Sequence, residues 1–140
     1  MNPSREELIH RVTTYLRTAE ARDLEAASAF LAPDAGLLFP GGVRYRDLAD
    51  QYSSPMRRYR GITKTLDRFD VDEQEGVVAV HGTLEGENLH GVHFSGVRFI
   101  DRFEFVDGLI VRQYVWNDLA TTGVLEATTT SELPAELRAA

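Results

Sequence analysis

The hydrophobic period of the chain changes near Ile62, from a helical spacing of about 3.6 residues to alternation between apolar and polar residues. Before this point, a capping box at Ser4 and Glu7 predicts one helix, Asp23 offers the N-cap of a second, and a third begins near Asp47. After it, alternating segments are separated only by short turns, as in consecutive antiparallel strands. Helices followed by such strands predict an α+β fold.

The predicted strands would form one long, curved sheet. The pair Asp107-Gly108 marks a tight hairpin turn between the last two strands. Glycines at 82, 86, 91 and 96 supply the bends that a curved sheet needs. Such a sheet, with helices on one side, makes a cone with an interior. The predicted strands span residues 35–39, 62–71, 77–84, 92–106 and 109–117.

One domain accounts for the 140 residues, with 1–125 as the folded unit and 126–140 as a polar, loosely packed C-terminal tail. A chain of this length buries about two-thirds of its extended surface on folding. It contains no cysteine, which excludes disulfides and thiol catalysis. Its 15 basic and 22 acidic residues give a net charge of −7, which disfavours a nucleic acid or an anionic membrane as partner.

Neither a secretory signal nor a membrane span is indicated, so the sequence predicts a cytoplasmic protein. The pair Gly41-Gly42 is not part of a phosphate-binding motif, and no histidine spacing supports a metal site. The basic run at residues 57–60 is interpreted as a solvated helix end. We therefore expect no cofactor and no metal.

Alternation in the predicted strand 92–106 divides its side chains between two faces. Asp101 lies on the mainly apolar face and is the main candidate for catalysis, because burial raises the pKa of a carboxyl and suits it to proton transfer. The alternative is a structural carboxylate satisfied by the backbone or by Arg102. The face expected to point inward comprises His93, Ser95, Val97, Phe99, Asp101, Phe103 and Phe105.

Histidine and amide side chains extend this candidate site. His93 is a candidate proton carrier and His81 a candidate substrate contact, although a histidine in a strand is more often a hydrogen-bonded core or rim residue. On the last strand, one alternating face carries Gln113, Val115 and Asn117. Asn117 either orients a substrate oxygen or caps the end of the strand.

Aromatic residues are expected to form the walls of the pocket. The candidates are Phe39, Phe99, Phe103 and Tyr52, and the last belongs with Met56 and Tyr59 to a predicted helical stripe that either covers the mouth or packs as core. The opposite face of the sheet mixes apolar and charged groups, which predicts a two-fold homodimer. That face would comprise Val92, Phe94, Arg98, Ile100, Arg102 and Glu104.

Three segments resemble the nuclear-transport-factor-2-like superfamily, especially its SnoaL-like and ketosteroid-isomerase-like branches. They are residues 15–24, Phe39-Pro40-Gly41 and the run FIDRFEFVDGLIVRQYVWNDL from 99 to 119. The resemblance covers roughly residues 5–120 and implies a cystatin-like α+β barrel: a cone-shaped, curved antiparallel sheet with three N-terminal helices enclosing a pocket. It says little about activity, because this scaffold hosts isomerases, cyclases, dehydratases, epoxide hydrolases and non-catalytic binders.

The isomerase-like branch implies a role for Tyr15, which would join Asp101 in holding a developing enolate oxygen; the alternative is a tyrosine of the core. Phe39 stands where that branch has its catalytic Asp, which argues against a true steroid isomerase. The run 81–84 and Val115 lack the charged groups that the epoxide-hydrolase branch needs.

The resemblance also implies that Gln113, Val115 and Asn117 face inward on the last strand. Together with the residue patterns, it predicts a cofactor-independent enzyme that transfers protons next to a carbonyl, by isomerisation, dehydration or aldol-type cyclisation. The substrate would be a small hydrophobic or aromatic carbonyl compound. Asp101 would be the acid/base, His93 the second proton carrier, and Tyr15 and Asn117 the hydrogen-bond donors. The alternative is a non-catalytic ligand-binding or protein-interaction domain built on the same cone.

Overall fold

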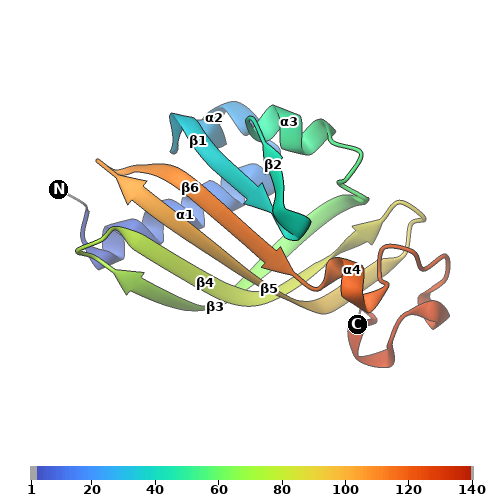
Figure 1. Ribbon diagram of the computed structural model, residues 1–140. Coiled ribbons are helices and arrows are strands. Elements are labelled where there is room, and N and C mark those ends of the chain that lie inside the picture. The colour runs from blue at the N-terminus through green and yellow to red at the C-terminus, as the bar shows by residue number, and fades with distance from the viewer. Residues whose placement is uncertain (1–2, 140) are drawn as a thin grey trace.

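A computed structural model describes residues 3–139 and contains one mixed sheet of six strands (Figure 1). The strands are β1 (Leu31–Phe39), β2 (Val43–Tyr45), β3 (Tyr59–Asp72), β4 (Val77–Asn88), β5 (His93–Val106) and β6 (Leu109–Asn117). Their order across the sheet is β2-β1-β6-β5-β4-β3. The predicted α+β class is confirmed, with one difference: β1 and β6 are parallel, whereas every other neighbouring pair is antiparallel.

Helices lie over one face of the sheet and at its open end. They are α1 (Arg5–Glu20), α2 (Leu24–Ser28), α3 (Leu48–Ser53) and α4 (Leu119–Thr122), with short 3-10 turns η1 (Pro40–Gly42), η2 (Thr130–Glu132) and η3 (Ala135–Leu137). The N-cap of α1 is the predicted one, because Ser4 accepts a hydrogen bond from the backbone N–H of Glu7. The predicted apolar stripe of α1 is buried: Leu8, Val12, Tyr15, Leu16 and Ala19.

The apolar residues Leu24, Ala27, Phe30 and Leu31 have a helical spacing, but the second helix ends before the last two of them. Asp23 caps α2 as expected, but the helix ends at Ser28, and Leu31 already pairs with Ile110 of β6. The register between β1 and β6 shifts in the interval that contains Pro33, which has no N–H to donate to the sheet. The strand predicted at 35–39 therefore begins four residues earlier, because pairing with β6 overrides the helical period.

The third helix is interrupted at Pro55, as a proline within a helical spacing predicts. α3 begins after Asp47 as predicted and ends at Ser53, just before Pro55. Tyr59 starts β3 instead of continuing the helix, and Met56 is 61% exposed. The predicted stripe of Tyr52, Met56 and Tyr59 is therefore not one helical face.

β5 changes the facing of its side chains at Gly96, which has a φ of +76°. The pairing of β5 with β4 shifts register at this point. Residues 97–105 alternate as predicted, but on the other side of the shift Phe94 is buried and His93 is exposed. A bulge moves the side chains before it to the opposite face. The predicted inward position of His93 is therefore wrong.

The C-terminal segment packs against the far end of the sheet, beside α4 (Figure 1). The buried Asn88 side chain donates to the carbonyl oxygens of Val124 and Ala127 at 2.9 and 2.8 Å. Phe94 forms a β-bridge with Arg138. Within residues 126–139, Ala127, Leu133 and Leu137 are buried, as are Val124 and Leu125 just before them. The loose packing of residues 126–140 stays a prediction.

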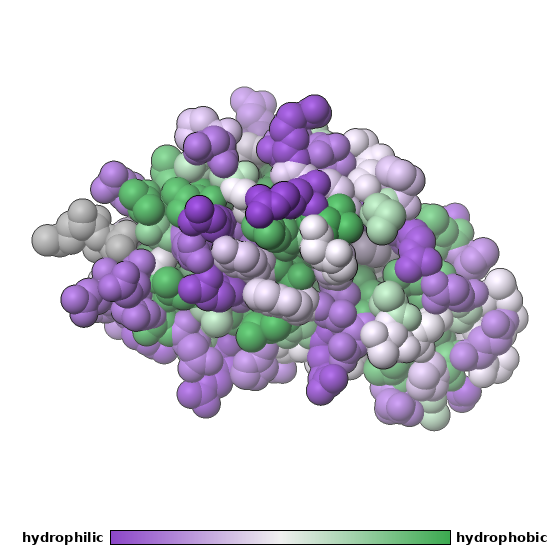
Figure 2. Space-filling model, in the orientation of Figure 1, coloured by the Kyte–Doolittle hydropathy of each residue, from purple (hydrophilic) through white to green (hydrophobic). Residues whose placement is uncertain are grey.

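The face proposed for a homodimer is only partly available. Val92 and Phe94 are buried, whereas Ile100 is 40% and Trp116 51% exposed. Tyr114 stacks on Trp116 with ring centroids 5.8 Å apart. Figure 2 shows hydrophilic and apolar residues interspersed over the visible side of the molecule. The homodimer stays a prediction.

At Gly82, β4 lies against the backbone of β3 with no room for a side chain. A Cβ atom at this position of β4 would lie 1.8 Å from the backbone oxygen of Thr65 on β3. At Gly61, in contrast, a Cβ would meet nothing within 4 Å. Any side chain at position 82 would therefore force the backbones of β3 and β4 apart.

Gly82→Ala is expected to lower the free energy of unfolding by about 3 kcal/mol, because a backbone atom cannot move aside as a flexible side chain can. Gly61→Ala should change it by about 0.5 kcal/mol or less. Urea denaturation of both variants measures the difference. Equal effects would contradict the close approach at Gly82.

Candidate functional site

Two adjoining chambers lie among the sheet, α1 and α3. The wide chamber has a volume of about 530 Å³ and extends toward η1 and α4. The narrow chamber, of about 90 Å³, reaches Tyr15 of α1 and Gln113 of β6. Their combined size suits a small organic ligand. Both chambers are lined by Phe39, Gln51, Arg57, Tyr59, Ile62 and Lys64.

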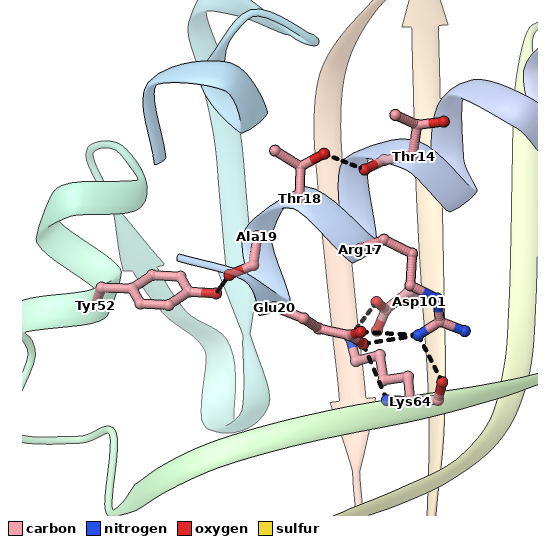
Figure 3. A network of polar contacts seen from close by, with 8 residues as sticks. All are labelled: Thr14, Arg17, Thr18, Ala19, Glu20, Tyr52, Lys64 and Asp101. Atoms are coloured by element: carbon pink, nitrogen blue, oxygen red, sulfur yellow. Dashed lines mark hydrogen bonds and ion pairs between the residues drawn. The ribbon is translucent and has the colours of Figure 1, made fainter. Parts of the chain in front are cut away.

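A buried ion pair lies beside these chambers (Figure 3). Asp101 of β5 is fully buried, and its Oδ2 accepts a hydrogen bond from Lys64 Nζ at 2.5 Å. The Lys64 side chain lines both chambers and its Nζ lies 5.0 Å from the centroid of the Phe99 ring. Asp101 Oδ1 has no hydrogen-bond partner among residues 3–139. Asp101 lines neither chamber, so Lys64 stands between the carboxyl and the chambers.

Burial raises the pKa of the Asp101 carboxyl above its usual range. The charge of Lys64 and its hydrogen bond oppose this rise, as does the Gln113 side chain, but they do not cancel it. The carboxyl therefore holds a proton more tightly than a carboxyl in water.

The end of α1 fixes the backbone at Lys64 (Figure 3). The Lys64 N–H donates to Glu20 Oε2 at 3.0 Å, and Arg17 Nη1 donates to the Lys64 carbonyl oxygen at 2.8 Å. Arg17 also pairs with Glu20 Oε1 at 2.8 Å. These contacts hold β3 against α1 and set the position from which the lysine side chain extends.

Lys64 was not among the candidates taken from the sequence, although a signal for it exists. In the predicted strand 62–71 it occupies an alternate position between Ile62 and Leu66. A lysine in an otherwise apolar, inward set needs a buried partner. Gln51 was missed as well: it is 4% exposed on α3 and lines both chambers.

Tyr15 is connected to the ion pair only through Gln113. Its hydroxyl donates to Gln113 Oε1 at 2.7 Å, and its ring packs edge-to-face on Phe103 with centroids 5.9 Å apart. Burial, with the nearby charge of Asp101 second, raises the pKa of Tyr15, so the phenol stays neutral. The resemblance implied Tyr15 and Asp101 donating to one oxygen; instead, the Tyr15 hydroxyl is engaged by Gln113.

Asn117 and the aromatic candidates take different places. Asn117 lines the wide chamber. Its Oδ1 also accepts a hydrogen bond from the Leu119 N–H at 3.1 Å, so the side chain caps the end of the strand as well. Phe39 lines both chambers, whereas Phe103 is core. Tyr52 lines the narrow chamber, and its hydroxyl donates to the Ala19 carbonyl at 2.7 Å (Figure 3).

The two candidate histidines are not brought to the chambers. His93 is exposed before the bulge of β5, and His81 is exposed on β4, in a shallow hollow that it shares with Ile100 and Trp116.

Within residues 3–139, no group of three or more His, Cys, Asp or Glu side chains could hold a metal ion. No helix in that range is long and apolar enough to cross a membrane.

Arg57 corrects the interpretation of residues 57–60 as a solvated helix end. Its guanidinium lies over the rings of Tyr52 and Tyr59, at 4.4 and 4.6 Å from their centroids. Its Nε is buried and has no hydrogen-bond partner among the described residues. Arg57 is therefore part of the chamber wall, unlike the exposed Arg60.

A family model described as a SnoaL-like domain matches residues 12–113. Among solved structures, TerC co-crystallised with polyporic acid is 20% identical, with a TM-score of 0.73 over 86% of this chain and 99% of that one. A provisionally named polyketide cyclase from Xanthomonas campestris pv. campestris is 19% identical, with a TM-score of 0.72 over 86% of this chain and 98% of that one. An LEH-like epoxide hydrolase from M. tuberculosis is 20% identical, with a TM-score of 0.69 over 89% of this chain and 93% of that one. At these identities the likeness shows a shared fold, and no curated protein sequence matches the chain.

The ion pair makes a prediction about stability and pH. In the wild type, an Asp101 pKa raised above the unfolded value of about 4 means that stability falls as pH rises from about 4 to the folded pKa. Lys64→Met removes the largest opposing effect, so the folded pKa rises further and stability keeps falling to higher pH. The variant should lie about 3 kcal/mol below the wild type at pH 7, and closer to it at pH 4.

Denaturation of both proteins between pH 4 and pH 8 measures this difference. The double variant Lys64→Met/Asp101→Asn is the control, because without the carboxyl the extra pH dependence should vanish. A stability difference that does not change with pH would contradict the burial of an ionisable Asp101.

Proposed function

Because this chain belongs to the SnoaL-like domain family, within the nuclear-transport-factor-2-like superfamily, we propose that it is a small enzyme that moves protons next to a carbonyl of a hydrophobic substrate. The observation that carries this proposal is the buried pair of Lys64 and Asp101 beside two chambers. Lys64 is the group that touches the substrate, and Asp101 stores or supplies a proton behind it.

The proposed cycle begins with the proton of the pair on Asp101. Lys64 is then a neutral amine facing the substrate. It takes a proton from the carbon next to the carbonyl, and the C–H electrons form the enolate. The resulting ammonium stays beside the enolate and stabilises its charge.

The ammonium then returns the proton. Delivery to another carbon completes an isomerisation, and delivery to a departing hydroxyl releases water. In an aldol-type cyclisation, the enolate carbon attacks a second carbonyl and the new alkoxide takes the proton. Each outcome balances without a further reactant.

Asn117 is the proposed hydrogen-bond donor to the substrate oxygen. Its Oδ1 is used by the Leu119 N–H, which leaves the Nδ2 amide hydrogens as the group that it can offer to the wide chamber. Tyr15 and Gln113 are positioning residues, because the Tyr15 hydroxyl is bound to Gln113. His93, the second proton carrier expected from the sequence, has no part in this proposal.

A non-catalytic ligand-binding domain is the second candidate. It is favoured by one observation: the Asp101 carboxyl is fully buried and bonded to Lys64, so it touches no ligand directly. A binder needs the chambers but not the exchange of a proton between the two residues. Proton transfer to a bound ketone separates the two functions.

The test follows the loss of α-proton signals of propiophenone, 1-tetralone and methyl 3-benzoylpropionate in D₂O by ¹H NMR. Wild-type protein is expected to accelerate exchange of at least one ketone. Lys64→Met and Asp101→Asn should each slow the enzyme-dependent rate by about 100-fold or more. Lys64→Arg should fail equally, because a guanidinium does not give up its proton at neutral pH.

His93→Gln is the matched control and should exchange at the wild-type rate, because His93 is exposed and away from the chambers. Ketones that raise the melting temperature of the wild type but show no exchange would reject the enzyme in favour of the binding domain.

A further inference from the structure

The chamber wall contains one cation that the proposed proton transfer does not use. Arg57 follows α3 and lines both chambers. Its guanidinium lies between the rings of Tyr52 and Tyr59, an arrangement in which cation–π attraction holds the plane of the group in place. The two rings therefore fix the position of the Arg57 guanidinium, whereas a solvated surface arginine would be free to move.

The charges around the wide chamber are unequal. Three cationic side chains line it, whereas no Asp or Glu among the described residues does. Arg58 pairs with Glu126 at 2.8 Å, and Lys64 pairs with Asp101 at 2.5 Å. For Arg57, no carboxylate within residues 3–139 lies at ion-pair distance. The chamber therefore has one uncompensated positive charge.

The unpaired donors of Arg57 form a defined edge. Its Nη1 donates to the Tyr59 carbonyl oxygen at 3.5 Å. Nε is buried without a partner, a costly state for a charged donor. In a guanidinium, Nε and Nη2 share one edge, and that edge can bind both oxygens of a carboxylate.

We propose that Arg57 binds the carboxylate of the substrate, so that the substrate class is a hydrophobic oxo acid. This inference rests on the proposed function, since it places the acid at Arg57 and the reacting carbonyl at Lys64. The apolar wall between them, which includes Phe39 and Ile62, receives the hydrocarbon part. A carboxylate bound beside the guanidinium would supply the missing negative charge.

The test compares 3-benzoylpropionate with its methyl ester, which differs only in lacking the charge. Affinities are measured by calorimetry at one ionic strength. The wild type should bind the acid at least tenfold more tightly than the ester. Arg57→Gln should remove this preference and leave the affinity for the ester within twofold of the wild type. Arg57→Lys should keep only part of the preference, because a lysine lacks the planar pair of donors.

Arg58→Gln is the matched control: it removes a neighbouring cation that already has a partner, and should keep the preference of the wild type. Equal binding of acid and ester by the wild type would overturn the inference. So would an Arg57→Gln variant that loses affinity for both ligands equally, because Arg57 would then merely support the wall.

Exchange of the α-protons of the ester separates this inference from the proposed function. If Arg57→Gln still exchanges the ester while the acid is not preferred by the wild type, only the carboxylate site is rejected. If the acid is preferred and neither compound exchanges, the carboxylate site stands and the proton-transfer function is rejected.

Discussion

The contact between Asp101 and Lys64 links the fold to the chemistry. A fully buried carboxylate is strongly destabilising unless it is paired or protonated, and here a lysine from another strand meets it at 2.5 Å. Lys64 is opposite Leu84 of β4 and Asp101 is opposite Val80, so the two register positions flank Gly82.

The same pair divides the interior into a core and a set of chambers. On one side lies Phe103, which packs against Tyr15 at the edge of the narrow chamber, where the Tyr15 hydroxyl donates to Gln113. On the other side, the Lys64 side chain lines the two chambers, and Arg57 forms part of their wall. Two cations with different roles emerge: one has a carboxylate partner within the protein, and the other lacks one among the described residues.

Local signals in the sequence were enough for much of the fold. The caps at Ser4 and Asp23, the change of period and the turn at Asp107 all reflect interactions between near neighbours. A bend at Gly96 was predicted, but the change of side-chain facing there was not, because it depends on how β5 pairs with β4. This change reversed the facing of His93. Arg57 was misassigned for a similar reason: Tyr52 and Tyr59 enclose it only after α3 has ended and β3 has begun.

The ionisation of Asp101 can be measured directly, by following its ¹³Cγ resonance between pH 3 and pH 9. We expect a midpoint above the usual carboxyl range in the wild type, and a still higher one in Lys64→Met. Such a result would show a proton-holding carboxyl that Lys64 restrains. A wild-type midpoint below about 4 would instead make the pair a fixed structural ion pair, and would contradict the exchange of a proton between Asp101 and Lys64.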